Sequence, residues 1–155
     1  MAIDPTNLRF KLSQNFSLGE FAVSAAYPDL ASKIIFTEGD VVKLLYLCKT
    51  ILQPLRNFLG EAIVILSGKR SLELNTAVKG SPTSDHMFND FSCACDFLPV
   101  KSSDLAKVQA WLSQYPNNFG QLITYKDNGG NLHWCHVSLP TDRHIGEIMT
   151  TVIGE

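Results

Sequence analysis

The sequence predicts an α+β fold, a small antiparallel sheet flanked by helices, on three observations. Apolar residues recur at helical spacing between positions 41 and 59, whereas residues 62–66 form a short run rich in β-branched side chains. Two further strand-like runs, 121–125 and 132–138, are separated by the turn sequence Asp-Asn-Gly-Gly, which favours a β-hairpin. A chain of 155 residues with 45% hydrophobic content can bury one core, and neither repeat nor linker divides it, so we expect a single domain over residues 1–155.

The first half predicts helices on either side of one strand. Ser17 and Glu20 form a capping box, which starts a short helix. A longer helix is expected after Asp40, with Pro54 kinking or splitting its last turns. The run at 62–66 predicts a buried strand, and a helix from about Ser71 precedes a loop rich in Gly, Ser and Pro.

The second half continues the alternation of helices and strands. Ser102 or Ser103 is expected to cap a helix with one apolar face, which then packs on the sheet. The hairpin follows that helix. A last short helix is expected to begin at Thr141 or Asp142 and to run towards Val152.

Charge and composition exclude several classes of function. A net charge of -2 leaves no broad basic surface for nucleic acid, so no nucleic-acid partner is expected. No apolar run approaches the ~20 residues of a membrane span, and the N-terminus lacks the basic start and apolar core of a signal peptide. Synthesis in the cytoplasm is therefore expected. The four cysteines show no disulfide or zinc-ribbon spacing and are interpreted as buried free thiols: Cys48, Cys93, Cys95 and Cys135.

Five short motifs follow one another along the chain. Leu-Gln-Pro-Leu-Arg occupies 52–56, and Ser-Gly-Lys-Arg-Ser at 67–71 leads to Asn75. Ser84-Asp-His, Ala-Cys-Asp ending at position 96 and Trp-Cys-His at 134–136 complete the series. Together with the segment Phe-Ser-Leu-Gly-Glu-Phe near the N-terminus, this order resembles the D-alanyl-D-alanine carboxypeptidase and L-alanyl-D-glutamate endopeptidase family. The resemblance covers most of the chain and includes the family's small phage-type members, whose fold is shared with the hedgehog signalling domain.

The resemblance implies a catalytic Zn²⁺ bound by His86, Asp96 and His136. Three protein ligands leave the fourth tetrahedral position open for water, as hydrolysis requires. The resemblance also implies that Arg70 faces the substrate, where its planar fork binds a carboxylate or stabilises a developing oxyanion. The other candidate substrate-binding residues are Ser84, which follows a loop, and Trp134, which shares a strand face with His136.

The spacing of the ligands departs from the family pattern. The family separates its first His from its Asp by seven residues, whereas His86 and Asp96 are ten apart, so residues 87–91 contain a three-residue insertion. Ser92 stands where the family has glycine. The insertion is harmless if it bulges as a loop before the strand, and damaging if it displaces Asp96.

The general base is the second departure. Many relatives carry Glu or Asp three residues before the last His, and this position is His133. The strand at 119–125 also lacks the acids common in small relatives. Because a neutral imidazole accepts a proton near pH 7, His133 is the candidate catalytic base, with Asp127 and Asp90 as weaker candidates. His144 is interpreted as an ordinary polar residue.

Two functions therefore remain open. The first is zinc-dependent hydrolysis of peptide bonds in bacterial peptidoglycan stem peptides, by a carboxypeptidase or an endolysin-type endopeptidase. The alternative is a catalytically impaired module that serves as a virion structural protein or binds the cell wall. Both agree with a phage-encoded protein that is made in the host cytoplasm without a signal peptide, acts at the cell wall or is carried in the virion, and has virion proteins as possible partners.

Overall fold

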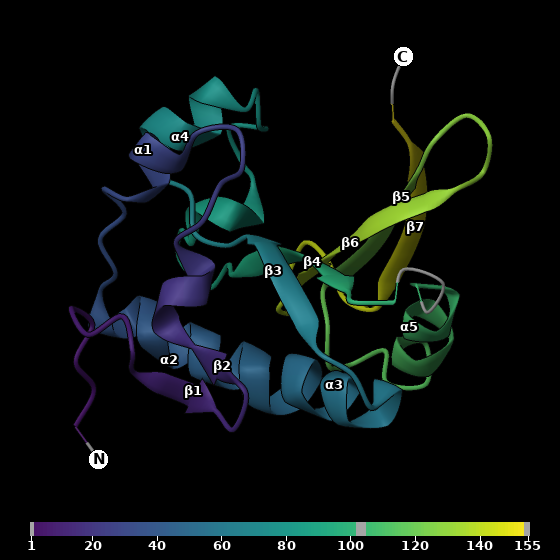
Figure 1. Cartoon of the computed structure of the whole chain (residues 1–155), viewed down its shortest axis with the longest axis horizontal. Helices are drawn as coiled ribbons and strands as arrows, with labels where there is room; N and C mark the ends of the chain where they lie inside the picture. The colour runs from purple at the N-terminus through teal and green to yellow at the C-terminus, as the bar shows by residue number, and fades with distance from the viewer. Residues whose placement is uncertain (1, 102–104, 154–155) are drawn as a thin grey trace.

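The computed structural model describes residues 2–101 and 105–153, and a five-stranded sheet lies at its centre (Figure 1). In spatial order the strands are β3 (Ile63–Ser67), β4 (Ala94–Pro99), β6 (Leu132–Ser138), β5 (Gln121–Lys126) and β7 (Glu147–Val152). All neighbours pair antiparallel except β5 and β7, which are parallel. The predicted α+β class and the hairpin of β5 and β6 are confirmed, and one parallel pair is added at the edge.

A small N-terminal unit precedes the sheet. It contains the ribbon β1 (Lys11–Ser13) and β2 (Phe16–Ser17), the 3₁₀ helix η1 (Leu18–Phe21) and the helix α1 (Pro28–Ala31). The predicted capping box is confirmed, because the Ser17 N–H donates to Glu20 Oε2 at 2.6 Å. Leu18 and Phe21 are thereby buried in the core.

The long helix is a rod of three consecutive segments, α2 (Glu38–Leu47), the π-helical η2 (Cys48–Leu52) and α3 (Gln53–Leu59). It begins before Asp40 because Thr37 caps it: the Asp40 N–H donates to Thr37 Oγ1 at 3.1 Å, and Asp40 Oδ2 accepts from the Thr37 N–H at 2.9 Å. The wide π turn directly precedes Pro54, whose nitrogen has no hydrogen to donate. The predicted disturbance near Pro54 therefore takes the form of a π segment.

β3 differs from its prediction as a buried strand. Ile63 and Ile65 are buried, whereas Val64 and Leu66 expose 48% and 37% of their surface. The reason is that the core covers only one face of β3, so every second side chain points away from it. The exposed positions of β3 are apolar like the buried ones, so the sequence alone did not reveal which residues are exposed.

Three short helices connect the strands. They are α4 (Leu72–Ala77), the 3₁₀ helix η3 (Asp85–Met87) and α5 (Leu105–Leu112). Ser71 caps α4 by accepting the Leu74 N–H at 3.1 Å. The apolar face predicted for α5 is confirmed, since Leu105, Val108 and Leu112 are buried and contact the sheet. The predicted caps Ser102 and Ser103 lie outside the described residues.

The predicted C-terminal helix is wrong. Residues 147–152 instead form β7, whose register with β5 runs from Gln121↔Glu147 to Lys126↔Val152. Gly146, at φ 64°, turns the chain out of any helical path just before this strand. The strand also contains several β-branched residues, which favour extended structure. Its pairing also gives hydrogen-bond partners to the backbone groups at the edge of β5. These requirements outweigh the weak helical spacing of Ile145 and Met149.

The two faces of the sheet have opposite character. One face of the sheet is turned towards the rod and α5 (Figure 1). It carries the buried side chains of Cys95, Phe97, Leu122, Cys135 and Val137. All four cysteines are buried and free, as predicted. The opposite face presents Asp96 and His136. Within the described residues, no helix has the length and apolar character that a membrane span requires.

Candidate metal centre

The position of His86 is set by a close backbone approach at Gly68. A Cβ atom on Gly68 would lie 2.2 Å from the Phe21 carbonyl oxygen, so only glycine fits between η1 and the end of β3. The neighbouring Lys69 N–H donates to the same Phe21 oxygen at 2.8 Å, and the Arg70 N–H donates to the His86 carbonyl at 2.7 Å. The Gly68 carbonyl then lies 2.8 Å from His86 Nδ1. These contacts fix the loop and the imidazole ring together.

Asp96 and His136 come from neighbouring strands and are paired in register. They are Cα partners of β4 and β6, so their side chains emerge side by side on the open face of the sheet. His136 Nδ1 lies 3.0 Å from Asp96 Oδ1 and 3.1 Å from His86 Nε2, and the remaining separation, His86 Nε2 to Asp96 Oδ1, is 3.2 Å. Three ligand-type atoms therefore converge on one point.

The hydrogen atoms of this cluster leave a place for a cation. His86 Nδ1 faces a carbonyl oxygen, which only accepts, so the neutral ring carries its hydrogen there and turns the lone pair of Nε2 towards Asp96. Two acceptors then face each other at 3.2 Å. A tetrahedral Zn²⁺ with bonds of about 2.0–2.1 Å separates neighbouring ligand atoms by about 3.3 Å. The donor set and its spacing thus fit zinc.

The ionisation of the cluster also suits a metal. Burial raises the pKa of Asp96, but electrostatic attraction to His86 and hydrogen bonding with the two imidazoles in the metal-free cluster outweigh burial and hold that pKa well below its usual range. Burial lowers the pKa of His136, with the Asp96 hydrogen bond opposing it only in part. A carboxylate and a neutral imidazole are the forms that bind metal.

The insertion before β4 bulges as a loop and leaves Asp96 beside both histidines. Phe88 and Asp90 adopt positive φ angles of 57° and 52°, which turn the chain back on itself. The Lys43 ammonium donates to the Phe88 carbonyl at 2.6 Å and to the Asp90 carbonyl at 3.1 Å. Ser92 closes the loop, because its hydroxyl donates a hydrogen bond to the Asn89 carbonyl at 2.7 Å. The extra residues are thus anchored to α2.

The Arg70 side chain lies beside the cluster, and Asn75 holds it in place. Its Nη2 lies 3.7 Å from Asp96 Oδ2, while Nη1 donates to Asn75 Oδ1 at 3.3 Å. Asn75 in turn donates to the Ser81 carbonyl at 2.9 Å. A Cβ on Gly80 would lie 2.1 Å from Asn75 Oδ1, so any larger residue there would displace the Asn75 amide that holds Arg70. The Ser-Gly-x-Arg-Ser-x-x-x-Asn motif is therefore one structural unit that aims a guanidinium at the site.

A cleft of about 340 Å³ opens over the cluster. His86, Asp96 and His136 line it together with Arg70 and Ser84. An adjoining hollow of about 800 Å³, bounded by the insertion loop and residues 140–145, shares Thr83, Ser84 and Arg143 with it.

Comparison with known protein families agrees with this geometry. A sequence profile of the family described as Peptidase M15 matches residues 22–137, about three quarters of the chain. The chain belongs to the peptidase M15 family. This family consists of zinc-dependent peptidases, so the His-Asp-His cluster occurs in a metallopeptidase framework. No curated protein sequence matches the chain.

In this M15 protein, Ser84 and Trp134 have supporting positions. Ser84 Oγ accepts the His86 N–H at 3.3 Å and caps η3, so it holds the ligand loop. In the described part of the chain, Trp134 does not line the cleft; it stacks on Tyr125 with ring centroids 4.6 Å apart. Tyr125 lines the cleft instead. Burial and the Asp96 charge raise the pKa of Tyr125, so its hydroxyl keeps its proton.

The structure does not bring His133 into the cleft. It lies on the opposite face of β6 from His136 and pairs with Asp127, at 3.1 Å between His133 Nε2 and Asp127 Oδ2. The hydrogen bond from His133 and those from Asn131 lower the pKa of Asp127 to about 2. Asp90 lines the adjoining hollow rather than the cleft over the cluster. None of the three base candidates therefore faces the ligands.

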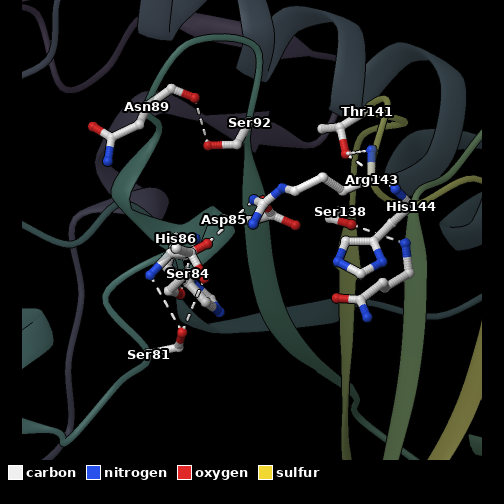
Figure 2. A network of polar contacts seen from close by, with 12 residues as sticks. Ser81, Ser84, Asp85, His86, Asn89, Ser92, Ser138, Thr141, Arg143 and His144 are labelled. Atoms are coloured by element: carbon white, nitrogen blue, oxygen red, sulfur yellow. Dashed lines mark hydrogen bonds and ion pairs between the residues drawn. The ribbon is translucent and has the colours of Figure 1, made fainter.

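Several cleft residues were missed by the sequence analysis. Figure 2 shows Arg143 extending from the C-terminal loop towards Asp85, with His144 drawn beside it. Arg143 Nη2 lies 3.1 Å from Asp85 Oδ1 and 3.3 Å from the Thr83 carbonyl, which links this loop to the loop of His86. Gln121 and His144 line the same cleft. The prediction of a C-terminal helix concealed these residues, whereas the strand alternation of β5 would have indicated Gln121 and Tyr125.

Proposed function

We propose that this protein hydrolyses peptide bonds of bacterial peptidoglycan stem peptides with a zinc ion bound by His86, Asp96 and His136. The observation that carries the proposal is the convergence of three ligand atoms, all within 4.8 Å of one another, in an open cleft. Membership of the M15 family supports the peptidase chemistry. The resemblance to wall-degrading members supports the substrate class and leaves carboxypeptidase and endopeptidase action as the two alternatives.

The described residues divide the chemical tasks. When bound, zinc lowers the pKa of a coordinated water and polarises the scissile carbonyl. Arg70, fixed by Asn75, presents its guanidinium beside the metal ligands and binds the developing oxyanion or a substrate carboxylate. The Tyr125 hydroxyl retains its proton and supplies a further donor on the same wall.

The test is zinc content and amine release measured on the same samples. Wild-type protein is expected to bind about one zinc per chain and to release amines from purified peptidoglycan. His86→Ala and His136→Ala are expected to lose both, because each removes one of three ligands. His133→Ala is the matched control, since this histidine lies outside the cleft. Full hydrolysis by His136→Ala would refute the proposal.

A second candidate function is a binding module without catalysis. The observation in its favour is that, among described residues, the only carboxylates lining the cleft are Asp85 and Asp96, paired with Arg143 and the histidines. Neither is a free base. Zinc binding together with retention of wall peptide, but without amine release at any pH, would favour this function over the enzyme.

We also propose that the protein is phage-encoded, made in the host cytoplasm and active at the cell wall or within the virion. The resemblance to small phage-type family members supports this origin. Amine release from intact walls treated from outside tests action at the wall. Mass spectrometry of purified particles tests carriage in the virion with other virion proteins, and absence from particles would remove that part of the proposal.

A further inference from the structure

The cleft contains a third histidine besides the two metal ligands, and a carboxylate binds it. His144 Nδ1 lies 2.7 Å from Glu147 Oε2, and the Gln121 amide donates to Glu147 Oε1 at 3.1 Å. His144 and Gln121 both line the cleft over the metal ligands. This arrangement is an imidazole oriented by an acid, which is the usual construction of a proton-transfer group.

The surrounding backbone fixes this pair. The His144 N–H donates to Thr141 Oγ1 at 3.3 Å, and its carbonyl accepts the Thr141 N–H at 3.0 Å. The register of β7 on β5 places Glu147 beside Gln121. A Cβ on Gly120 would lie 3.0 Å from the His144 carbonyl, so the turn sits directly on the start of β5. The imidazole therefore belongs to a defined turn against the sheet.

The hydrogen bond to Glu147 determines which ring nitrogen carries the lone pair. Hydrogen bonds from His144 and Gln121 lower the pKa of Glu147, so the carboxylate stays ionised and accepts the Nδ1–H. Nε2 is then the nitrogen that carries the lone pair. The nearest cation on the same loop, Arg143, is paired with Asp85 across the cleft. Glu147 is thus the charged group in contact with the ring.

We propose that His144 is the proton-transfer residue of the hydrolysis and that Glu147 is its positioning residue. This proposal rests on the proposed function. In it, His144 takes the role of the acid that relatives carry at the position of His133. Nε2 takes a proton from the attacking water as the water oxygen bonds to the scissile carbonyl carbon. The C–N bond then breaks and the amine leaves with that proton. The second water hydrogen stays on the new carboxylic acid and passes from there to the amine, so the products are a carboxylate and an ammonium group.

The chain provides a matched control for this role. His133 is also hydrogen-bonded to a carboxylate, Asp127, but lies on the far face of β6 and outside the cleft. His144→Gln and His133→Gln therefore make the same chemical change in two similar pairs, one that lines the cleft over the ligands and one outside it. The side chains of these two histidines bind Asp127 and Glu147 rather than the metal ligands, so zinc content is expected to stay at the wild-type level in both variants.

The first experiment compares kcat, KM and zinc content of these variants on a soluble stem peptide. His144→Gln is expected to lower kcat about 100-fold or more, which is the usual contribution of a general base, with KM and zinc content retained. His133→Gln is expected to match wild type.

Glu147→Gln adds a readout of positioning. Loss of the negative charge weakens the acceptor of the Nδ1–H, so kcat on the soluble stem peptide is expected to fall while KM and zinc content stay at the wild-type level. In ¹⁵N NMR of the zinc-loaded protein, the wild-type His144 ring should be the Nδ1–H tautomer, and the variant should lose this preference.

The outcomes separate this proposal from the proposed function. An active wild type with an equally active His144→Gln would overturn the role of His144 and leave the peptidase intact. A loss of activity in His133→Gln alone would transfer the role to His133. Loss of zinc in His144→Gln would make that residue structural, which also overturns the proposal. A zinc-loaded but inactive wild type would overturn both proposals.

Discussion

Replacing Gly68 by alanine is expected to weaken zinc binding although Gly68 is not a ligand. The new Cβ would lie 2.2 Å from the Phe21 carbonyl oxygen and 2.5 Å from the Phe21 Cα. Both are backbone atoms, so the segment that carries the Gly68 carbonyl must shift. That carbonyl holds His86 Nδ1 at 2.8 Å and thereby aims Nε2 at the metal position.

The magnitude follows from two costs. Overpacking of this kind costs about 1–3 kcal/mol of unfolding free energy, or about 2–4 °C of melting temperature for each kcal/mol in a domain of this size. Loss of the hydrogen bond that orients a ligand histidine lowers metal affinity about 10- to 100-fold. Gly68→Ala is expected to show both effects.

The assay separates the two costs. Unfolding in urea with a chelator present measures the metal-free protein, and competition with a chelator of known affinity measures zinc binding. Gly39→Ala is the matched control, because its Cβ would meet only Thr37 Oγ1 at 3.7 Å. If Gly68→Ala binds zinc and unfolds as wild type does, the contact with Phe21 does not position His86 and the reasoning is wrong.

Three further predictions follow from the same contacts. Asn75→Ala removes the acceptor at 3.3 Å from Arg70 Nη1, so kcat/KM for a stem peptide is expected to fall about tenfold or less with zinc content unchanged, and steady-state kinetics with metal analysis checks this. The pKa of Asp96 is depressed in the folded protein, so its charge stabilises the metal-free fold above the unfolded-state pKa of about 3.9 and this contribution is lost as the pH falls. The difference in unfolding free energy between metal-free wild type and Asp96→Asn is therefore expected to shrink below about pH 4, and a constant difference would contradict this. Burial raises the pKa of Cys135 to about 11 and also raises the pKa of the other three thiols, so Ellman's reagent is expected to label none of the four in the native protein and all four after denaturation.

The sequence motifs identified much of this site because their residues carry both local structure and chemistry. Gly68 and Arg70 belong to one motif since the backbone approach and the guanidinium are parts of the same turn. Strand alternation alone placed Asp96 and His136 on the face opposite the cysteines. The family and the fold class were therefore predictable from the sequence.

Other features depended on tertiary contacts that no local pattern contains. The position of the insertion loop depends on Lys43, which lies far away in the sequence and binds its carbonyls. The pairing of β7 with β5 overrides the weak helical spacing of residues 141–152. His144 becomes a cleft residue only through that pairing. The position of His133 was predictable in principle, because odd spacing from His136 places it on the opposite strand face.

Zinc K-edge absorption spectroscopy of the zinc-loaded protein tests the central claim most directly. A site formed by His86, Asp96 and His136 predicts only nitrogen and oxygen neighbours at about 2.0–2.2 Å, with the multiple-scattering signal of two imidazoles. His136→Ala should remove this signal. A sulfur shell at about 2.3 Å, or a wild-type spectrum with a single imidazole, would contradict the assigned ligand set.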